Sequence, residues 1–115
     1  MSHINCLNMS GNLTVDPVMK YTDKGIPFCI MRMASSHYIN KDKKDVCFIN
    51  VVMWGARAES CAQYLKKGSL IMVSGRLRMR EAKKAQGVET ITYNTYEIKA
   101  EEIKFTFKPK EPTEE

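Results

Sequence analysis

A strand-like pattern of apolar side chains is clearest between Asp45 and Gly55. This segment is rich in β-branched and aromatic residues, contains no proline and ends on glycine, which is typical of a β-strand. Successive side chains of a strand point to opposite faces. The face expected to be core comprises Cys47, Ile49, Val51 and Met53. The other face carries Val46, Phe48, Asn50, Val52 and Trp54. Either both faces are buried, or the second face is an aromatic platform for planar ligands.

The same patterns predict four more strands. They are expected over 4–15, 26–36, 69–79 and 90–100, with a further apolar stretch over 103–107 continuing the last one. A glycine inside the first of them, Gly11, predicts a bulge or a bend, because glycine weakens regular pairing. The sequence Thr-Asp-Lys-Gly, which ends at Gly25, predicts a turn before the second strand.

Helical spacing of apolar residues occurs in one segment, residues 56–67. Two lysines followed by Gly68 are typical of a helix end. Two segments rich in charge, 37–44 and 81–89, are predicted to be loops. Residues 108–115 contain no core-forming side chains, and we predict that they form a short tail.

The predicted order of elements is three strands, one helix and two strands. This is the order of the OB fold, a five-stranded Greek-key barrel with a short helix between its third and fourth strands. We therefore predict an all-β protein with an OB-fold domain over residues 1–107 and a tail over 108–115. A five-stranded sheet with a loosely attached helix is the alternative.

Composition limits the class of protein. With 115 residues and 43% hydrophobic content, the chain is long enough to fold around one core. No apolar run approaches the ~20 residues of a membrane span, and the first residues do not resemble a secretory signal, so a cytoplasmic location is expected. The four cysteines form no CxxC pair, and two histidines make a zinc site improbable. We expect no metal and no cofactor.

Catalytic motifs are absent from the sequence. It contains no P-loop, no GxSxG and no HExxH, and its carboxylates are scattered over predicted turns and loops. A nuclease would need clustered carboxylates to hold its metal ions. The sequence therefore favours a binding module over an enzyme.

Basic residues give the first indication of a ligand. The net charge is +5, and residues 1–107, with 16 basic and 10 acidic residues, carry +6. Arg76, Arg78 and Arg80 stand at alternate positions, so their guanidinium groups project from one face of a strand. A solvated barrel exterior would account for one or two such residues. Three arginines in register favour contact with a polyanion, because arginine pairs with phosphate and stacks on bases.

Aromatic residues beside basic ones favour single-stranded nucleic acid. Exposed rings stack on bases, while basic groups follow the phosphate backbone. Trp54, Phe48 and Tyr38 are the best stacking candidates, and Tyr93 and Tyr96 are weaker ones. The predicted binding residues are Trp54, Phe48, Tyr38, Arg32, Arg76, Arg78, Arg80, Lys41, Lys43, Lys44, Lys67 and Tyr93.

A series of short motifs runs through almost the whole chain. Its members are Gly-Asn-Leu at 11–13, Asp-Pro at 16–17, Val-Val-Met-Trp-Gly at 51–55, Tyr-Leu-Lys-Lys-Gly-Ser at 64–69, Gly-Arg-Leu-Arg at 75–78 and Tyr-Glu-Ile at 96–98. Each motif alone is weak. In this order, over residues 4–105, the series resembles bacterial-type single-stranded-DNA-binding proteins.

The resemblance implies an OB fold that assembles as a homotetramer and wraps single-stranded DNA without sequence preference, in replication, recombination or repair. It implies a cytoplasmic, nucleoid-associated protein. It also implies that Trp54 and Phe48 occupy stacking positions, and that Tyr38 or Ile39 lies near a third one.

Two departures from the family pattern stand out. Glu81 and Ala82 occupy positions where the family often has an aromatic residue, so we expect one stacking site to be missing. The long tail with an acidic, Phe-ended tip is also missing, which makes recruitment of partner proteins through the tail doubtful. A specialised phage, plasmid or primosome-type OB protein, or an oligomeric scaffold with incidental nucleic-acid contact, is the alternative function.

Overall fold

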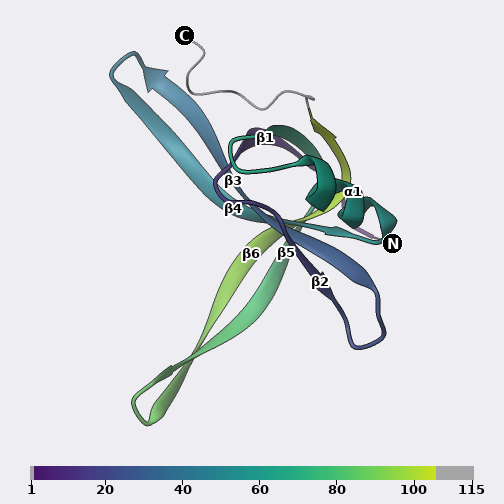
Figure 1. Ribbon diagram of the computed structural model, residues 1–115. Coiled ribbons are helices and arrows are strands. Elements are labelled where there is room, and N and C mark those ends of the chain that lie inside the picture. Colours follow the sequence, from purple (N-terminus) through teal and green to yellow (C-terminus); the bar gives the residue numbers. More distant parts are fainter. Residues whose placement is uncertain (1, 106–115) are drawn as a thin grey trace.

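The strands and the helix follow one another in the predicted order. The computed structural model describes residues 2–105 (Figure 1). Its elements are β1 (Leu7–Leu13), β2 (Val18–Tyr21), β3 (Pro27–Asn40), β4 (Lys43–Trp54), α1 (Ala56–Tyr64), β5 (Leu70–Gln86) and β6 (Glu89–Phe105). The prediction of an all-β protein with one short helix is confirmed. The short strand β2 was not predicted.

Strand pairing closes a barrel. β1 pairs antiparallel with β5 and, through Asn12 and Leu13, also with β3. β4 pairs antiparallel with β3 and parallel with β6, and β5 and β6 pair antiparallel. The ring β1–β5–β6–β4–β3 is therefore the predicted five-stranded OB barrel, with the helix between its third and fourth strands. β2 pairs with β3 outside this ring.

Gly11 lies where β1 passes from β5 to β3. The β1–β5 register stays regular through Gly11, so no bulge forms there. A Cβ atom at this position would collide with the backbone carbonyl of Ala34 in β3. The glycine therefore permits a close approach of two strands. A register shift occurs instead between Ser74 and Gly75, and it leaves Glu101 of β6 without a partner residue in β5.

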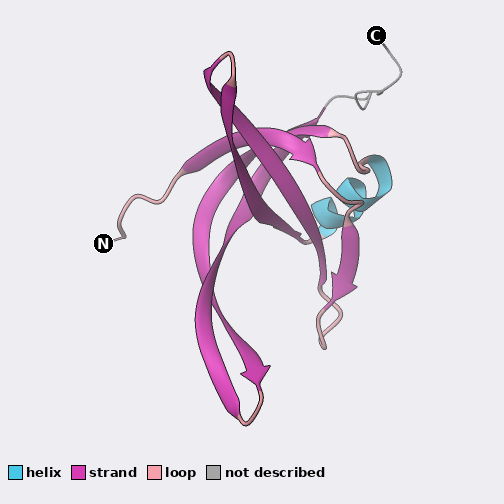
Figure 2. Ribbon diagram, turned by 90° about the vertical axis from the view of Figure 1, so that its left-hand side faces the viewer, coloured by secondary structure: helices cyan, strands magenta, loops and turns pink. Residues whose placement is uncertain are grey.

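The core lies inside the barrel and beneath α1. It contains the predicted core residues Val51 and Met53, together with buried residues of the other strands, Leu13, Cys29, Met31, Met33, Ile71, Val73, Ile98 and Ala100. α1 adds Ala58 and Cys61, and Leu65 follows it. The helix lies against one side of the barrel (Figure 2). It ends at Tyr64, three residues earlier than predicted, because Leu65 is extended.

Two long hairpins project from the barrel in different directions (Figure 1). We call them the β3–β4 arm (residues 34–48) and the β5–β6 arm (residues 78–96). The predictions of loops over 37–44 and 81–89 were wrong, because both segments are strands joined by tight turns at Lys41–Asp42 and Gly87–Val88. Backbone pairing continues in both segments although neither face of the ribbon meets the core there, so their charged side chains stay exposed.

The prediction that Cys47 belongs to the core was also wrong. Cys47 is exposed and pairs with Ser35 in the β3–β4 arm. Ile49, two residues nearer the barrel, is half-buried, and Val51 is fully buried. The alternation predicted for this strand is thus correct, but its core face begins only where the strand enters the barrel.

Residues 2–105 include no helix that is long and apolar enough to cross a membrane. The predicted tail, 108–115, and the end of the apolar stretch predicted over 103–107 lie outside the described residues.

Candidate nucleic-acid interface

One face of the sheet combines most of the predicted binding residues. In β3 and β4 the odd-numbered residues of the barrel, such as Met31 and Met53, fill the core. Directly opposite residues in a ladder share a face. The register pairs Phe28 with Trp54, Arg32 with Asn50 and Tyr38 with Lys44. These even-numbered residues therefore lie on the face turned away from the core, which we call the outer face.

The outer face continues into β6 and β5. Asn50 of β4 is opposite Glu97 of β6, and Glu97 is opposite Arg78 of β5. In the next row, Val52, Lys99 and Arg76 align in the same way. Both arginines are exposed. Strands β3, β4, β6 and β5 thus present one continuous surface.

Trp54 is stacked on a residue that sequence reasoning missed. The rings of Phe28 and Trp54 have centroids 4.6 Å apart and an interplanar angle of 25°. Both residues are half-buried, and the indole Nε1 of Trp54 is buried without a hydrogen-bond partner among the described residues. Phe28 therefore covers part of the Trp54 ring and holds it in place. The only sequence signal for this pair was that Phe28 lies near the start of one predicted strand and Trp54 near the end of the next.

Phe48 and Tyr38 are more open than Trp54. Phe48 is 55% exposed and Tyr38 is 66% exposed. A cation lies near each ring: the guanidinium carbon of Arg32 is 5.7 Å from the Phe48 centroid, and Lys44 Nζ is 5.7 Å from the Tyr38 centroid. Arg32 Nη1 also donates a hydrogen bond of 3.1 Å to Asn50 Oδ1. The predicted stacking residues of the β3–β4 arm are therefore exposed and adjacent to basic groups.

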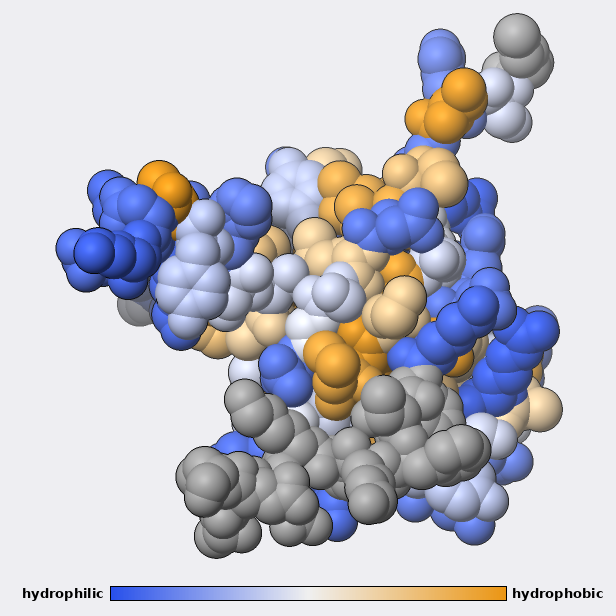
Figure 3. All heavy atoms as spheres, turned by 90° about the horizontal axis from the view of Figure 1, so that it is seen from above, coloured by the Kyte–Doolittle hydropathy of each residue, from blue (hydrophilic) through white to orange (hydrophobic). Residues whose placement is uncertain are grey.

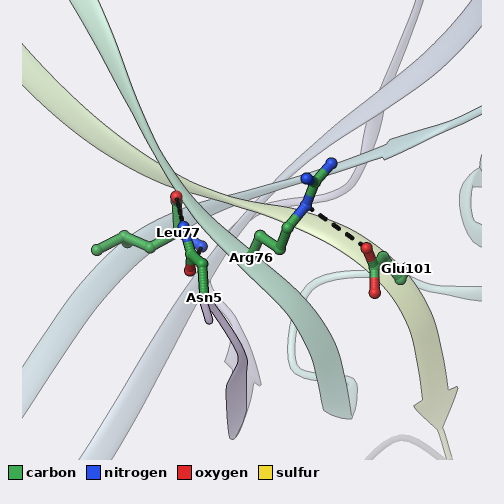
Figure 4. Close-up of polar contacts among 4 residues, drawn as sticks. All are labelled: Asn5, Arg76, Leu77 and Glu101. Carbon is green, nitrogen blue, oxygen red and sulfur yellow. Dashed lines mark hydrogen bonds and ion pairs between the residues drawn. The ribbon is translucent and has the colours of Figure 1, made fainter. Parts of the chain in front are cut away.

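The three arginines of β5 differ in their partners. Arg76 Nε is 3.5 Å from Glu101 Oε2, and both side chains are well exposed (Figure 4). Arg80 Nη2 is 3.6 Å from Oε2 of Glu97, whose side chain is only 8% exposed. Arg78 forms no ion pair or side-chain hydrogen bond within residues 2–105. No local pattern indicated these two carboxylate partners, since Glu97 and Glu101 are distant in sequence from the arginines.

An asparagine near the N-terminus steadies the start of the β5–β6 arm. Asn5 Nδ2 donates to the backbone carbonyl of Leu77 at 2.9 Å, and the Leu77 N–H donates to Asn5 Oδ1 at 3.0 Å (Figure 4). The side-chain amide thereby continues the pairing of β1 along β5. Arg76 and Arg78 flank this anchored residue.

The remaining predicted residues lie at the tips of the arms or outside the sheet. Lys41 is in the turn of the β3–β4 arm and Lys43 begins β4. The β3–β4 arm points to the upper left in Figure 1. In the view from above it forms the mainly hydrophilic lobe on the left (Figure 3). Tyr93 lies on the outer face of β6, opposite Ala82. Lys67 is in the turn after α1, outside the four strands of the outer face, and its backbone N–H donates to Asp16 Oδ1 at 2.8 Å.

Comparison with known proteins identifies the family. The profile of the single-strand binding protein family matches residues 4–106. This chain belongs to that family. Proteins of the single-strand binding family bind DNA and are not enzymes, so the prediction of a binding module is confirmed.

Curated relatives agree with this assignment. The chain is 36% identical to single-stranded DNA-binding protein 2 of Chlorobaculum tepidum, over 100% of this chain and 79% of that protein. It is 39% identical to the single-stranded DNA-binding protein of Clostridium tetani, over 89% of this chain and 70% of that protein. It is 35% identical to single-stranded DNA-binding protein A of Bacillus subtilis, over 89% of this chain and 59% of that protein.

Proposed function

We propose that this single-strand binding family protein binds single-stranded DNA without sequence preference. The observation that carries the proposal is the outer face, where exposed aromatic rings and basic groups lie on one sheet surface across four strands. Rings offer a stacking surface to every base, and basic groups neutralise phosphates irrespective of sequence. In keeping with its family, we assign it to DNA replication, recombination and repair, in the cytoplasm.

Stacking on bases falls to residues of β3 and β4. Phe48 and Tyr38 have exposed rings, and Trp54 offers the part of its ring that Phe28 does not cover. Trp54 and Phe48 are six residues apart on β4, which corresponds to about 20 Å along a strand. A single strand that contacts both must therefore lie along β4. Tyr93, opposite Ala82, is our candidate to replace the aromatic residue that the family often has near that position.

Contacts to phosphate fall to β5 and to the tip of the β3–β4 arm. Of Arg76, Arg78 and Arg80, only Arg78 has no carboxylate partner among the described residues, so its guanidinium is free to bind a phosphate. Arg76 and Arg80 are each paired with a carboxylate, and a phosphate would have to compete with that ion pair. Lys41, Lys43 and Lys44 are exposed and extend the basic surface.

We further propose that the protein forms a homo-oligomer, as a tetramer of the 13.2-kDa chain. The face of β5 and β6 opposite the arginines exposes three apolar side chains, Leu77, Met79 and Tyr96. Met79 and Tyr96 are directly opposite each other, so they form one patch. Burial of such a patch between copies would stabilise an oligomer. Light scattering coupled to size exclusion measures the mass.

A fluorescence titration tests the DNA-binding proposal. Trp54 is the only tryptophan, so its emission reports on this site alone. Adding oligo-dT should quench the emission to saturation, and the affinity should fall steeply with salt. A double-stranded oligonucleotide of equal length is the control. Saturable quenching by oligo-dT supports the proposal; no binding by a folded protein in low salt contradicts it and favours an oligomeric scaffold.

A further inference from the structure

A buried carboxylate lies in the middle of the basic outer face. Glu97 is only 6% exposed, while the arginines around it are half exposed. Its Oε2 accepts no hydrogen bond from residues 2–105 and has Arg80 at 3.6 Å as its ion-pair partner. A buried carboxylate is costly to desolvate unless it is well paired. Core packing does not explain this position, because Glu97 shares the face of Arg78 and not that of Ile98.

The register places Glu97 at the centre of a polar row. Arg32 of β3, Asn50 of β4, Glu97 of β6 and Arg78 of β5 are aligned across the four strands. Arg32 is bound to the amide of Asn50, and Arg80 is paired with Glu97. Aromatic residues lie on both sides of this row along β4, Phe48 towards the arm and Trp54 towards α1. The row therefore divides the stacking surface.

The carboxylate changes the electrostatics of the face locally. It offsets one guanidinium charge where the sheet is otherwise most basic, and a buried charge is screened by salt less than an exposed one. The row and the neighbouring Arg80 carry three guanidinium groups, those of Arg32, Arg78 and Arg80, so Glu97 lowers their net charge from +3 to +2 and places a negative charge between them. A phosphate placed over Glu97 meets a like charge, whereas an uncharged base does not.

We propose that Glu97 is a specificity-determining residue that favours single-stranded over double-stranded nucleic acid. The inference rests on the proposed function and deepens it. A single strand can turn its bases towards the row at Glu97 and its phosphates towards the edges. A duplex keeps its bases paired inside and presents phosphates and sugars to the sheet surface, so its charge comes to lie over the carboxylate. Simple polyanions such as polyphosphate are disfavoured for the same reason.

The test compares wild type with Glu97→Gln, which removes the charge and keeps the shape. Anisotropy titrations use fluorescein-labelled oligo-dT, a duplex of equal length, and polyphosphate as competitor. Glu97→Gln should raise affinity for the duplex and for polyphosphate by about tenfold, and for oligo-dT by less than about threefold. The matched control is Glu101→Gln, which removes an equally charged but exposed partner of Arg76 and should leave the ratio of single-strand to duplex affinity unchanged.

A second variant covers a failure of Glu97→Gln to fold, which thermal melting would reveal. Asn50→Asp adds a carboxylate to the same row at a half-buried position. It should raise the ratio of single-strand to duplex affinity. An unchanged ratio in both folded variants, or a loss of oligo-dT affinity without a gain for duplex in Glu97→Gln, overturns the inference. Wild type that does not bind oligo-dT refutes the proposed function itself, so the two failures are distinguishable.

Discussion

The two hairpin arms are built alike but carry different chemistry. Each is a two-stranded antiparallel ribbon that leaves the barrel, and each contributes one side to the outer face (Figure 1). The β3–β4 arm presents exposed rings with cations beside them, as at Phe48 and Tyr38. The β5–β6 arm and the strand leading into it present a row of arginines, and two of these are paired with carboxylates.

This difference separates two contributions to binding. Stacking on the β3–β4 side depends on ring area and is weakly sensitive to salt, whereas phosphate contacts on the β5 side release counterions and depend on salt strongly. Because two of the three arginines on the β5–β6 side are paired with carboxylates, the three need not contribute equally to DNA binding. Variants in the two regions should therefore be distinguishable by their salt dependence.

The largest effect is expected on the stacking side. Trp54→Ala should weaken binding to oligo-dT by about 1–3 kcal/mol for each base that stacks on the ring. The substitution also removes the ring that Phe28 packs on, so the variant must first be shown to be folded. Because Trp54 is the only tryptophan, binding is followed by anisotropy of a labelled oligonucleotide. Wild-type affinity in a folded Trp54→Ala protein would show that the residue only packs.

Of the three arginines of β5, the one without a carboxylate partner should contribute most to the salt dependence of binding. Arg78→Ala is expected to flatten the slope of log K against log salt by up to about 0.7, the value for one single-strand phosphate contact. Arg76→Ala and Arg80→Ala should change it less, because each arginine exchanges a carboxylate for a phosphate. Slopes from titrations at several salt concentrations provide the measurement. Equal changes in all three variants would mean that the ion pairs have no influence.

A smaller effect is expected from the tail. Residues 108–115 contain three glutamates and no aromatic residue, and exposed pairs of carboxylates with a basic surface are worth ~0–1 kcal/mol and are screened by salt. Deletion of 108–115 should leave the melting temperature and the oligomer unchanged and should raise DNA affinity slightly at low salt. A large loss of affinity, or a partner protein captured only by the full-length chain, would make the tail a functional element.

The smallest effect is expected from the opposite face of the β3–β4 arm. Cys47 is exposed there, whereas burial together with the nearby Cys61 raises the pKa of the Cys29 thiol to about 11. Burial also raises the pKa of Cys61. At pH 8 a thiol reagent should therefore modify Cys6 and Cys47 quickly and the buried pair only after unfolding. Labelled protein should bind oligo-dT as unlabelled protein does. If labelling weakens binding in wild type but not in a Cys47→Ser variant, this face contacts the DNA.

Much of the barrel was predictable from local patterns. Alternation identified the core residues Val51, Met53, Ile71 and Val73, and the order of strands and helix indicated the OB topology. The outer parts of the arms, 37–44 and 81–89, were predicted as loops because these charged segments show no apolar alternation. Their pairing is set by the strands that enter the barrel, and this information is not local.

The sequence predicted which residues form the candidate site, but not which side chains those residues contact. Alternation placed Phe48, Trp54 and the three arginines on one side of their strands. The stack of Phe28 on Trp54 and the pair of Arg80 with Glu97 depend on the register between strands. A sequence contains no direct signal for that register when the partners are distant along the chain.

The division of binding between the two regions is tested most directly by Phe48→Ala and Arg78→Ala, measured side by side over a salt series with oligo-dT. Both residues are exposed, so neither change should unfold the barrel. We predict that Phe48→Ala lowers log K by the same amount at every salt concentration, giving a line parallel to wild type. Arg78→Ala should instead give a shallower line that approaches wild type at high salt. Two parallel lines, or a change of slope in Phe48→Ala alone, would contradict the assignment of stacking to β4 and of phosphate contacts to β5.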